Sequence, residues 1–188
     1  MIWLAILAEI VLLILALWVC CIVFKLYFVK GYSNYPPFVP TLGNVKKEEF
    51  LRLSSILKKT PKPLKILDPG CGTASLIAKL AKDFPQHSFV GIEWNKSLYK
   101  IAKFRNRNLP NVNILCQNMF DYSFKDIDII VCFLMEPLMK RFGEKIKKEG
   151  KQGLVVYSNT FSIPNIPLYE KIKTKKFLVF GNLYVYKL

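Results

Sequence analysis

The stretch Lys65-Ile66-Leu67-Asp68-Pro69-Gly70-Cys71-Gly72-Thr73-Ala74 decides the fold of this chain. Its first half predicts a buried strand that ends in a carboxylate, and its glycines predict a sharp turn where the backbone can approach a ligand closely. Residues 75–81 follow with the apolar spacing of an amphipathic helix. A strand, a glycine turn and a helix in this order form the crevice in which open α/β sheets hold nucleotide-like ligands.

The spacing of the glycines does not fit a dinucleotide site. The fingerprint of such a site needs a third glycine where Ser75 stands. Asp68 would repel a pyrophosphate but would favour a cationic ligand, such as the sulfonium and ammonium groups of S-adenosylmethionine (SAM). The run from Asp68 resembles the D-x-G-x-G-x-G loop of class I SAM-dependent methyltransferases, with Ala74 in place of the third glycine. The resemblance implies that Asp68, Gly70, Cys71 and Gly72 bind SAM.

Two later strand ends extend this expected cofactor site. Residues 88–93 predict a strand that ends in Glu93, about 20 residues after the glycines, where a carboxylate that binds ribose belongs. Trp94 follows it directly. Asn118 and Met119 come after the next strand, where the class I methyltransferases usually contact the adenine edge. The competing interpretation is that the glycines form an ordinary turn and that Glu93 is only solvated.

Strands and helices alternate along most of the chain. Expected helices cover residues 46–59, 73–83, 96–107 and 137–148, and expected strands cover residues 64–68, 88–93, 112–116, 127–134 and 153–159. This alternation predicts an α/β fold with a mostly parallel sheet. Lys176–Phe180 and Leu183–Lys187 predict a terminal antiparallel β-hairpin around Gly181-Asn182. The resemblance implies a Rossmann-like class I methyltransferase sheet.

The N-terminal segment differs from the rest. Ile2 to Phe24 is almost continuously apolar, with Glu9 as its one charged residue, and roughly 20 such residues can cross a bilayer as a helix. We expect a transmembrane anchor over residues 1–25, a linker and helix over 26–60, and the SAM-dependent domain over 61–188. Lysines follow the apolar run, so the positive-inside rule predicts a cytoplasmic catalytic domain.

The formal net charge of +15 is compatible with nucleic acid or with an anionic membrane surface as partner. A membrane is the simpler interpretation beside an expected anchor. Glu136-Pro137-Leu138-Met139 also lacks the Asn/Asp-Pro-Pro-aromatic signature of methyltransferases that act on nucleobases, which argues against nucleic acid. Five cysteines without CxxC spacing predict neither a disulfide framework nor a zinc site, and no metal is expected.

Candidates for a catalytic role follow the fourth and fifth strands. Glu136 and Asn159 would lie at the carboxyl edge of the sheet, where an acceptor enters. For Glu136, an acid before proline is also ordinary helix-start chemistry. Because the cofactor supplies the reactive methyl group, an amine acceptor needs only to arrive deprotonated, and a general base is not required by the sequence.

A narrower resemblance covers most of the chain. One apolar span, Pro37-Phe38-Val39-Pro40-Thr41, the glycine loop and Gly91-Ile92-Glu93-Trp94-Asn95 are similar to the membrane-anchored protein-lysine methyltransferases of the ATP synthase c subunit or adenine nucleotide translocase type. The resemblance implies SAM as cofactor, a lysine of a membrane-associated protein as acceptor, and Phe38, Pro40 and Thr41 near the substrate. The glycine loop itself departs from that family's usual Leu-Gly-Ser-Gly-Asp-Gly pattern. A lipid or hydrophobic small-molecule acceptor, and a non-catalytic SAM-fold module, remain alternatives.

Overall fold

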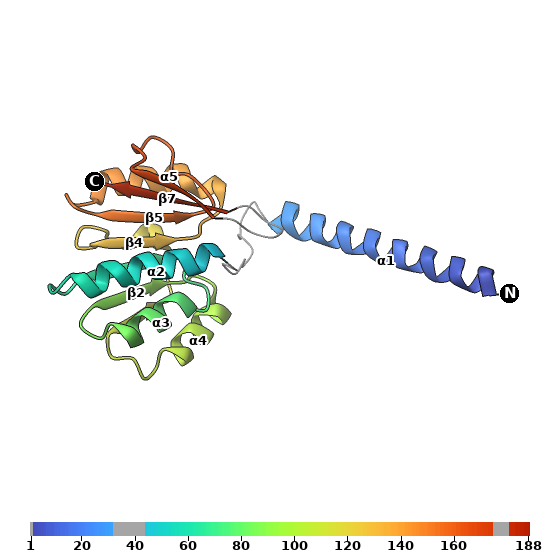
Figure 1. Cartoon of the computed structure of the whole chain (residues 1–188), viewed down its shortest axis with the longest axis horizontal. Coiled ribbons are helices and arrows are strands. Elements are labelled where there is room, and N and C mark those ends of the chain that lie inside the picture. The colour runs from blue at the N-terminus through green and yellow to red at the C-terminus, as the bar shows by residue number, and fades with distance from the viewer. Residues whose placement is uncertain (1, 32–43, 175–180) are drawn as a thin grey trace. The chain divides into compact units, whose positions relative to one another are not determined.

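The computed structural model describes residues 2–31, 44–174 and 181–188. The chain divides into two compact units, Met1–Val39 and Pro40–Leu188. The first holds helix α1, Ile2–Gly31. The second is an α/β domain, built from one sheet and the helices that pack on it (Figure 1).

The domain is built on one seven-stranded sheet with the order β3-β2-β1-β4-β5-β7-β6. Its parallel strands are β1 (Lys65–Pro69), β2 (Ser88–Ile92), β3 (Val112–Leu115), β4 (Ile129–Cys132) and β5 (Val155–Asn159). The last two, β6 (Glu170–Thr174) and β7 (Gly181–Lys187), are antiparallel, and β7 pairs with β5. This topology confirms the predicted Rossmann-like α/β fold with a C-terminal antiparallel pair.

Helices cover both faces of the sheet. The helices α2 (Asn44–Lys59), α3 (Ser75–Asp83) and α4 (Lys96–Arg105) share one core with Ile66 of β1, whereas α5 (Glu136–Glu149) shares the other core with the next residue, Leu67. This alternation follows from the two-residue period of a strand. Because both faces are covered, the central strand β4 is buried throughout, as its unbroken apolar sequence predicts.

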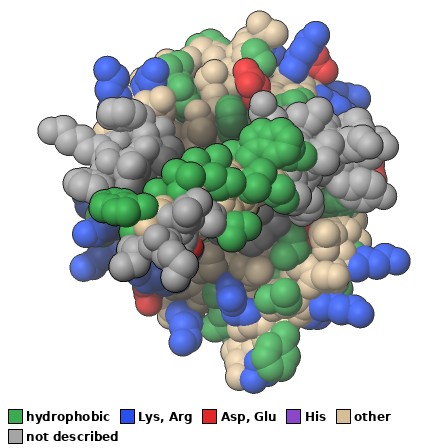
Figure 2. All heavy atoms as spheres, turned by 90° about the vertical axis from the view of Figure 1, so that its right-hand side faces the viewer, with side chains coloured by type: hydrophobic (Ala, Val, Ile, Leu, Met, Phe, Trp, Pro, Cys, Tyr) green, Lys and Arg blue, Asp and Glu red, His purple; other side chains and the backbone are tan. Residues whose placement is uncertain are grey.

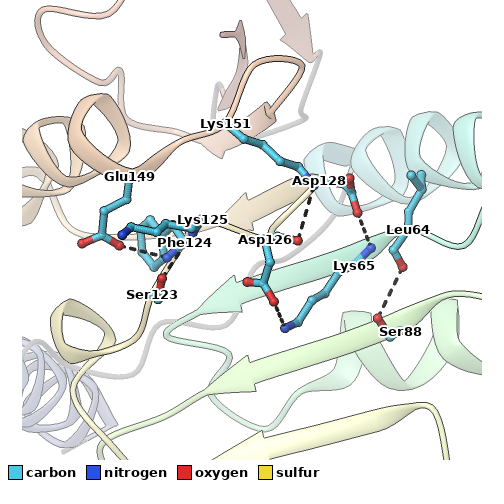
Figure 3. A network of polar contacts seen from close by, with 10 residues as sticks. All are labelled: Leu64, Lys65, Ser88, Ser123, Phe124, Lys125, Asp126, Asp128, Glu149 and Lys151. Atoms are coloured by element: carbon cyan, nitrogen blue, oxygen red, sulfur yellow. Dashed lines mark hydrogen bonds and ion pairs between the residues drawn. The ribbon is translucent and has the colours of Figure 1, made fainter.

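A polar network joins the amino-terminal ends of β1 and β4. Figure 3 shows Lys65 between two aspartates, with its side chain on Asp126 and its backbone N–H donating to Asp128. Lys151 binds the other oxygen of Asp128. Asp68 lies at the opposite end of β1, so this network fixes the strands while leaving the carboxyl edge of the sheet free for chemistry.

The C-terminal hairpin corrects one expectation. Gly181-Asn182 was predicted as the turn, but both residues lie in β7 and pair with Thr174 and Lys173 of β6. The first strand is Glu170–Thr174, where Ile172 packs on the core between charged residues, as suits an edge strand. The predicted strand over residues 176–180 lies outside the described residues.

The expected membrane span has no support from the structure. Among residues 2–31, 44–174 and 181–188, no helix combines the length and the apolar character that a membrane crossing requires.

Candidate functional site

The turn after β1 packs directly against the end of β2. The backbone N–H groups of Gly70 and Cys71 both donate to the carbonyl oxygen of Ile92, at 2.7 and 2.9 Å. Gly70 and Gly72 have φ values of +90° and +56°, in the left-handed region that glycine adopts without strain. The two glycines thus form a tight turn between the ends of two parallel strands.

Ala74, at the position of the third glycine, is also left-handed, with φ 53° and ψ 35°. An L-residue in this conformation costs about 1–2 kcal/mol. Ala74 is fully buried and directly precedes α3, whose first turn receives no side-chain cap from it. Ala74 therefore adopts the left-handed conformation expected of the third glycine, at the cost of backbone strain.

Glu93 ties the glycine turn to the segment after β2. One carboxylate oxygen accepts from the backbone N–H of Gly72 at 2.9 Å, and the other accepts from that of Asn95 at 2.8 Å. The side chain is buried, with 6% of its surface exposed. A carboxylate has about four acceptor positions, so Glu93 can hold both loops and still accept hydrogen bonds from two ribose hydroxyls.

Asp68 lies at the end of β1 and is half-buried. Burial, together with the nearby charge of Glu93, raises the pKa of its carboxyl to about 7, and Lys46 opposes this rise. Lys46 also donates from Nζ to Ser75 Oγ at 2.8 Å. A carboxyl group that gives up its proton near neutral pH is well suited to bind a cation, because the ionised form gains most from it.

Glu49, on α2, is a site residue that our sequence analysis missed. It is 3% exposed, and its pKa is raised to about 8 by burial and by Asp68, while Lys46 and Asn159 lower it. The signal was present: Glu49, Leu53 and Leu57 are spaced four residues apart, so Glu49 continues the buried stripe of the helix. A charged residue in that stripe is an exception that indicates function.

Asn159 lies at the end of β5 and is 2% exposed. Its Oδ1 accepts from the Thr160 hydroxyl, and its Nδ2 makes no hydrogen bond of ordinary geometry among the described residues, although the amide lies near enough to Glu49 to lower the pKa of that carboxyl. Cys132, the last residue of β4, is also buried; burial raises the pKa of its thiol, and the nearby Glu49 and Asp68 raise it further. The carboxyl ends of β1, β4 and β5 therefore meet beneath Glu49.

The remaining predicted cofactor residues line the other half of the same edge. The thiol of Cys71 lies over Gly91, where an added Cβ would approach its sulfur to 2.9 Å. Trp94, the second residue after β2, is 44% exposed. Asn118 accepts from the backbone N–H of Phe120 and so caps the short helix η1 (Met119–Asp121) after β3, and Met119 is buried against the core. All follow β1, β2 or β3, as predicted.

The other predicted residues are not brought together in this way. Glu136 is the first residue of α5, is exposed and precedes a proline, which is the geometry of an ordinary helix start. Phe38, Pro40 and Thr41 lie outside the described residues.

Comparison with known proteins shows which enzymes this chain is similar to. The ANTKMT methyltransferase domain family matches residues 68–170, which is more than half of the chain. A protein-lysine N-methyltransferase of Saccharolobus islandicus (strain REY15A) is 28% identical over 161 residues, covering 83% of this chain and 96% of that protein.

Solved structures show the same fold. An RNA methyltransferase from Salinibacter ruber, in complex with S-adenosyl-L-homocysteine, superposes with a TM-score of 0.67 at 16% identity, over 79% of this chain and 93% of the other. A mutant of MtNAS in complex with S-adenosylmethionine gives a TM-score of 0.60 at 12% identity, over 76% of this chain and 62% of the other. At such identities the likeness is one of architecture.

Proposed function

The chain belongs to the ANTKMT methyltransferase domain family and is a SAM-dependent methyltransferase, and from this we propose that it transfers the methyl group to the amine of a lysine in a protein. The observation that supports a lysine as acceptor is the similarity to the lysine methyltransferase of Saccharolobus islandicus. This similarity extends over almost the whole of that protein. The half-buried carboxyl of Asp68 and the buried carboxyl of Glu49 agree with it, because they favour cationic ligands.

The residues present suit SAM. Asp68 would face the positive charges of its methionine half, and Glu93 would accept from the ribose hydroxyls. The left-handed turn at Gly70 and Gly72 lets the backbone approach the cofactor. SAM supplies an activated methyl group, so the protein's task is to align the acceptor amine with it and to exclude water.

We propose further that the enzyme works at a membrane, on a membrane-associated protein, with its α/β domain on the cytoplasmic side. The supporting features are the apolar run Ile2–Phe24, the lysines that follow it and the net charge of +15. On the face shown in Figure 2, Lys and Arg side chains clearly outnumber Asp and Glu side chains. Attachment to the bilayer would raise the effective concentration of substrates held in the same bilayer.

The test uses the full-length chain, tritiated SAM and a detergent-solubilised membrane extract. We expect label in protein, released as methyl-lysine on acid hydrolysis. Label that moves into organic solvent would instead indicate a lipid or small-molecule acceptor. SAM binding without any transfer would indicate a non-catalytic module, and either outcome overturns the proposal.

A further inference from the structure

The cofactor assignment leaves one buried acid without a role. Glu49 comes from α2, outside the β1–β3 loops, and lies where the ends of β1, β4 and β5 meet. A buried carboxyl group that only stabilised the fold would need hydrogen bonds that hold it, because its desolvation is costly. The groups that act on Glu49 are a second carboxyl, Asp68, the ammonium of Lys46, and the incompletely bonded amide of Asn159.

The position of Glu49 separates it from the nucleoside half of SAM. Glu93 follows β2, so the ribose that it would bind lies on the β2 side of β1. Asn159 and Cys132 lie on the opposite side, because the sheet order runs β2-β1-β4-β5. A methyl acceptor must approach from the side that the nucleoside leaves open, so Glu49 lies on the acceptor side of the methyl group.

Asn159 supports an ionised Glu49. Its Nδ2 has no partner among the described residues, and it is a donor that can bond a carboxylate. A hydrogen bond to an ionised group is about twice as strong as one between neutral groups. The amide would therefore stabilise the negative form of Glu49 whenever a cation arrives to balance it.

Two aromatic rings follow the same strand ends. Phe133 comes directly after β4 and Phe161 follows β5; the rings stack with centroids 6.4 Å apart and planes 12° apart, and both residues are partly exposed. Ser158 Oγ donates to the carbonyl oxygen of Phe161 at 2.6 Å and fixes this turn. The rings follow the strands that end in Cys132 and Asn159, so they offer an apolar surface for the four-carbon stem of a lysine whose ammonium Glu49 would receive.

We propose that Glu49 is the catalytic proton acceptor for the substrate lysine, and that Asn159 stabilises its ionised form when the lysine binds. This inference rests on the lysine methyltransferase function proposed above. The ε-ammonium of the bound lysine gives one proton to the Glu49 carboxylate. The neutral amine then attacks the methyl group of SAM, a nitrogen–carbon bond forms and the carbon–sulfur bond breaks. The products are a methylated ammonium and neutral S-adenosylhomocysteine, and the proton on Glu49 leaves to solvent.

The raised pKa of Glu49, about 8, brings it nearer to that of an amine than an ordinary carboxyl would be. Proton transfer between groups of similar pKa is close to balanced, which is the condition for effective general base catalysis. Asp68, with a pKa of about 7, remains the partner of the cofactor cation.

The experiment compares wild type, Glu49→Gln and the control Glu48→Gln in the full-length chain. Glu48 is the neighbouring acid, half-buried and paired with Arg52 at 2.8 Å on the helix surface. SAM affinity is measured by calorimetry, and kcat is measured with tritiated SAM on the solubilised membrane extract between about pH 6 and pH 10. We expect Glu49→Gln to lower kcat by about 10²–10⁴-fold near neutral pH. Its SAM affinity should stay within about threefold of wild type, and Glu48→Gln should match wild type in both.

The pH profile provides a readout that a structural role would not change. Wild-type kcat should rise as the pair of Glu49 and lysine loses a proton, and Glu49→Gln should recover activity only at high pH, where the free amine is more abundant. Glu49→Asp should restore part of the neutral-pH rate. The proposal is overturned if Glu49→Gln keeps its kcat, if SAM affinity falls as much as kcat, or if wild-type kcat does not change with pH. Should wild type label no protein lysine at all, the proposed function fails and not only the role of Glu49.

Discussion

At the scale of single residues, the two raised acids make stability depend on pH. Asp68 and Glu49 have pKa values of about 7 and about 8 in the folded protein, against ordinary values of 3.8 and 4.5. Between the ordinary and the raised values the folded protein binds more protons than the unfolded chain, so the free energy of unfolding falls as pH rises through this window. The SAM-free protein should therefore be more stable near about pH 5 than above about pH 8.

Urea denaturation at a series of pH values tests this. Asp68→Asn and Glu49→Gln should each flatten the dependence, because each removes one titrating group. Asp126 and Glu149 have lowered pKa values, so their contribution to the free energy of unfolding is lost only at more acidic pH. They therefore do not change the stability between about pH 5 and pH 8. A wild-type protein that gains stability from pH 5 to pH 8 would contradict the raised values of both acids.

The glycine turn offers a second test at this scale. Gly70→Ala places a side chain at φ +90°, with its Cβ 3.1 Å from Leu134. Gly153→Ala is a matched control, since φ is +86° there and the Cβ meets nothing within 4 Å. Both variants should lose about 1–3 kcal/mol of stability from backbone strain. Only Gly70→Ala should also lose SAM affinity in calorimetric titration, and equal affinity in the two variants would exclude the turn from the cofactor site.

At the scale of elements, α2 is the helix that carries Glu49 to the sheet. Leu57 of this helix is fully buried in the core shared with α3 and α4, whereas Leu51 is 51% exposed. We expect Leu57→Ala to lower the free energy of unfolding by about 2–5 kcal/mol. Leu51→Ala should stay within about 0.5 kcal/mol of wild type. Chemical denaturation measures both, and similar losses would mean that α2 does not pack on the sheet as described.

Strands and helices of the α/β domain were largely predictable, because their apolar residues recur with the spacing of a strand or a helix. The glycine turn also marks where the first strand ends and the helix after it begins. The terminal hairpin was misplaced: Gly181-Asn182 has the composition of a two-residue turn, but pairing with β6 keeps it within β7. Local sequence preference favours the turn, and a long-range pairing overrides it.

The cofactor half of the site was equally predictable, since its residues follow directly after strands whose ends must meet. Glu49 was not, because it precedes the glycine turn by about 20 residues and only the packing of α2 brings it to β5. It stands in a run of charged residues with Lys46, Lys47 and Glu48, and such a run by itself indicates a solvated helix face. Only the stripe through Leu53 and Leu57 distinguishes it.

At the scale of the whole molecule, the proposed membrane association has two contributions that salt can separate. The net charge of +15 attracts anionic lipid, and salt screens this attraction. The apolar N-terminal segment gains from burial whatever the ionic strength, and leucines such as Leu12 and Leu13, both 65% exposed, each contribute about 1.5–3 kcal/mol when they leave water. We expect the full-length chain to sediment with membranes and to remain there after a wash at about 1 M salt, where the Debye length is about 3 Å.

A double variant assigns the remaining attachment to the segment itself. Leu12→Lys with Leu13→Lys removes two apolar side chains and adds two charges, so it should release most of the protein into the high-salt supernatant. Leu12→Ile with Leu13→Ile keeps the apolar area and should sediment like wild type. If the lysine variant remains bound after the salt wash, the attachment does not depend on this segment. If wild type itself is released by salt, charge alone holds the protein at the membrane, and the proposed role of the apolar segment is wrong.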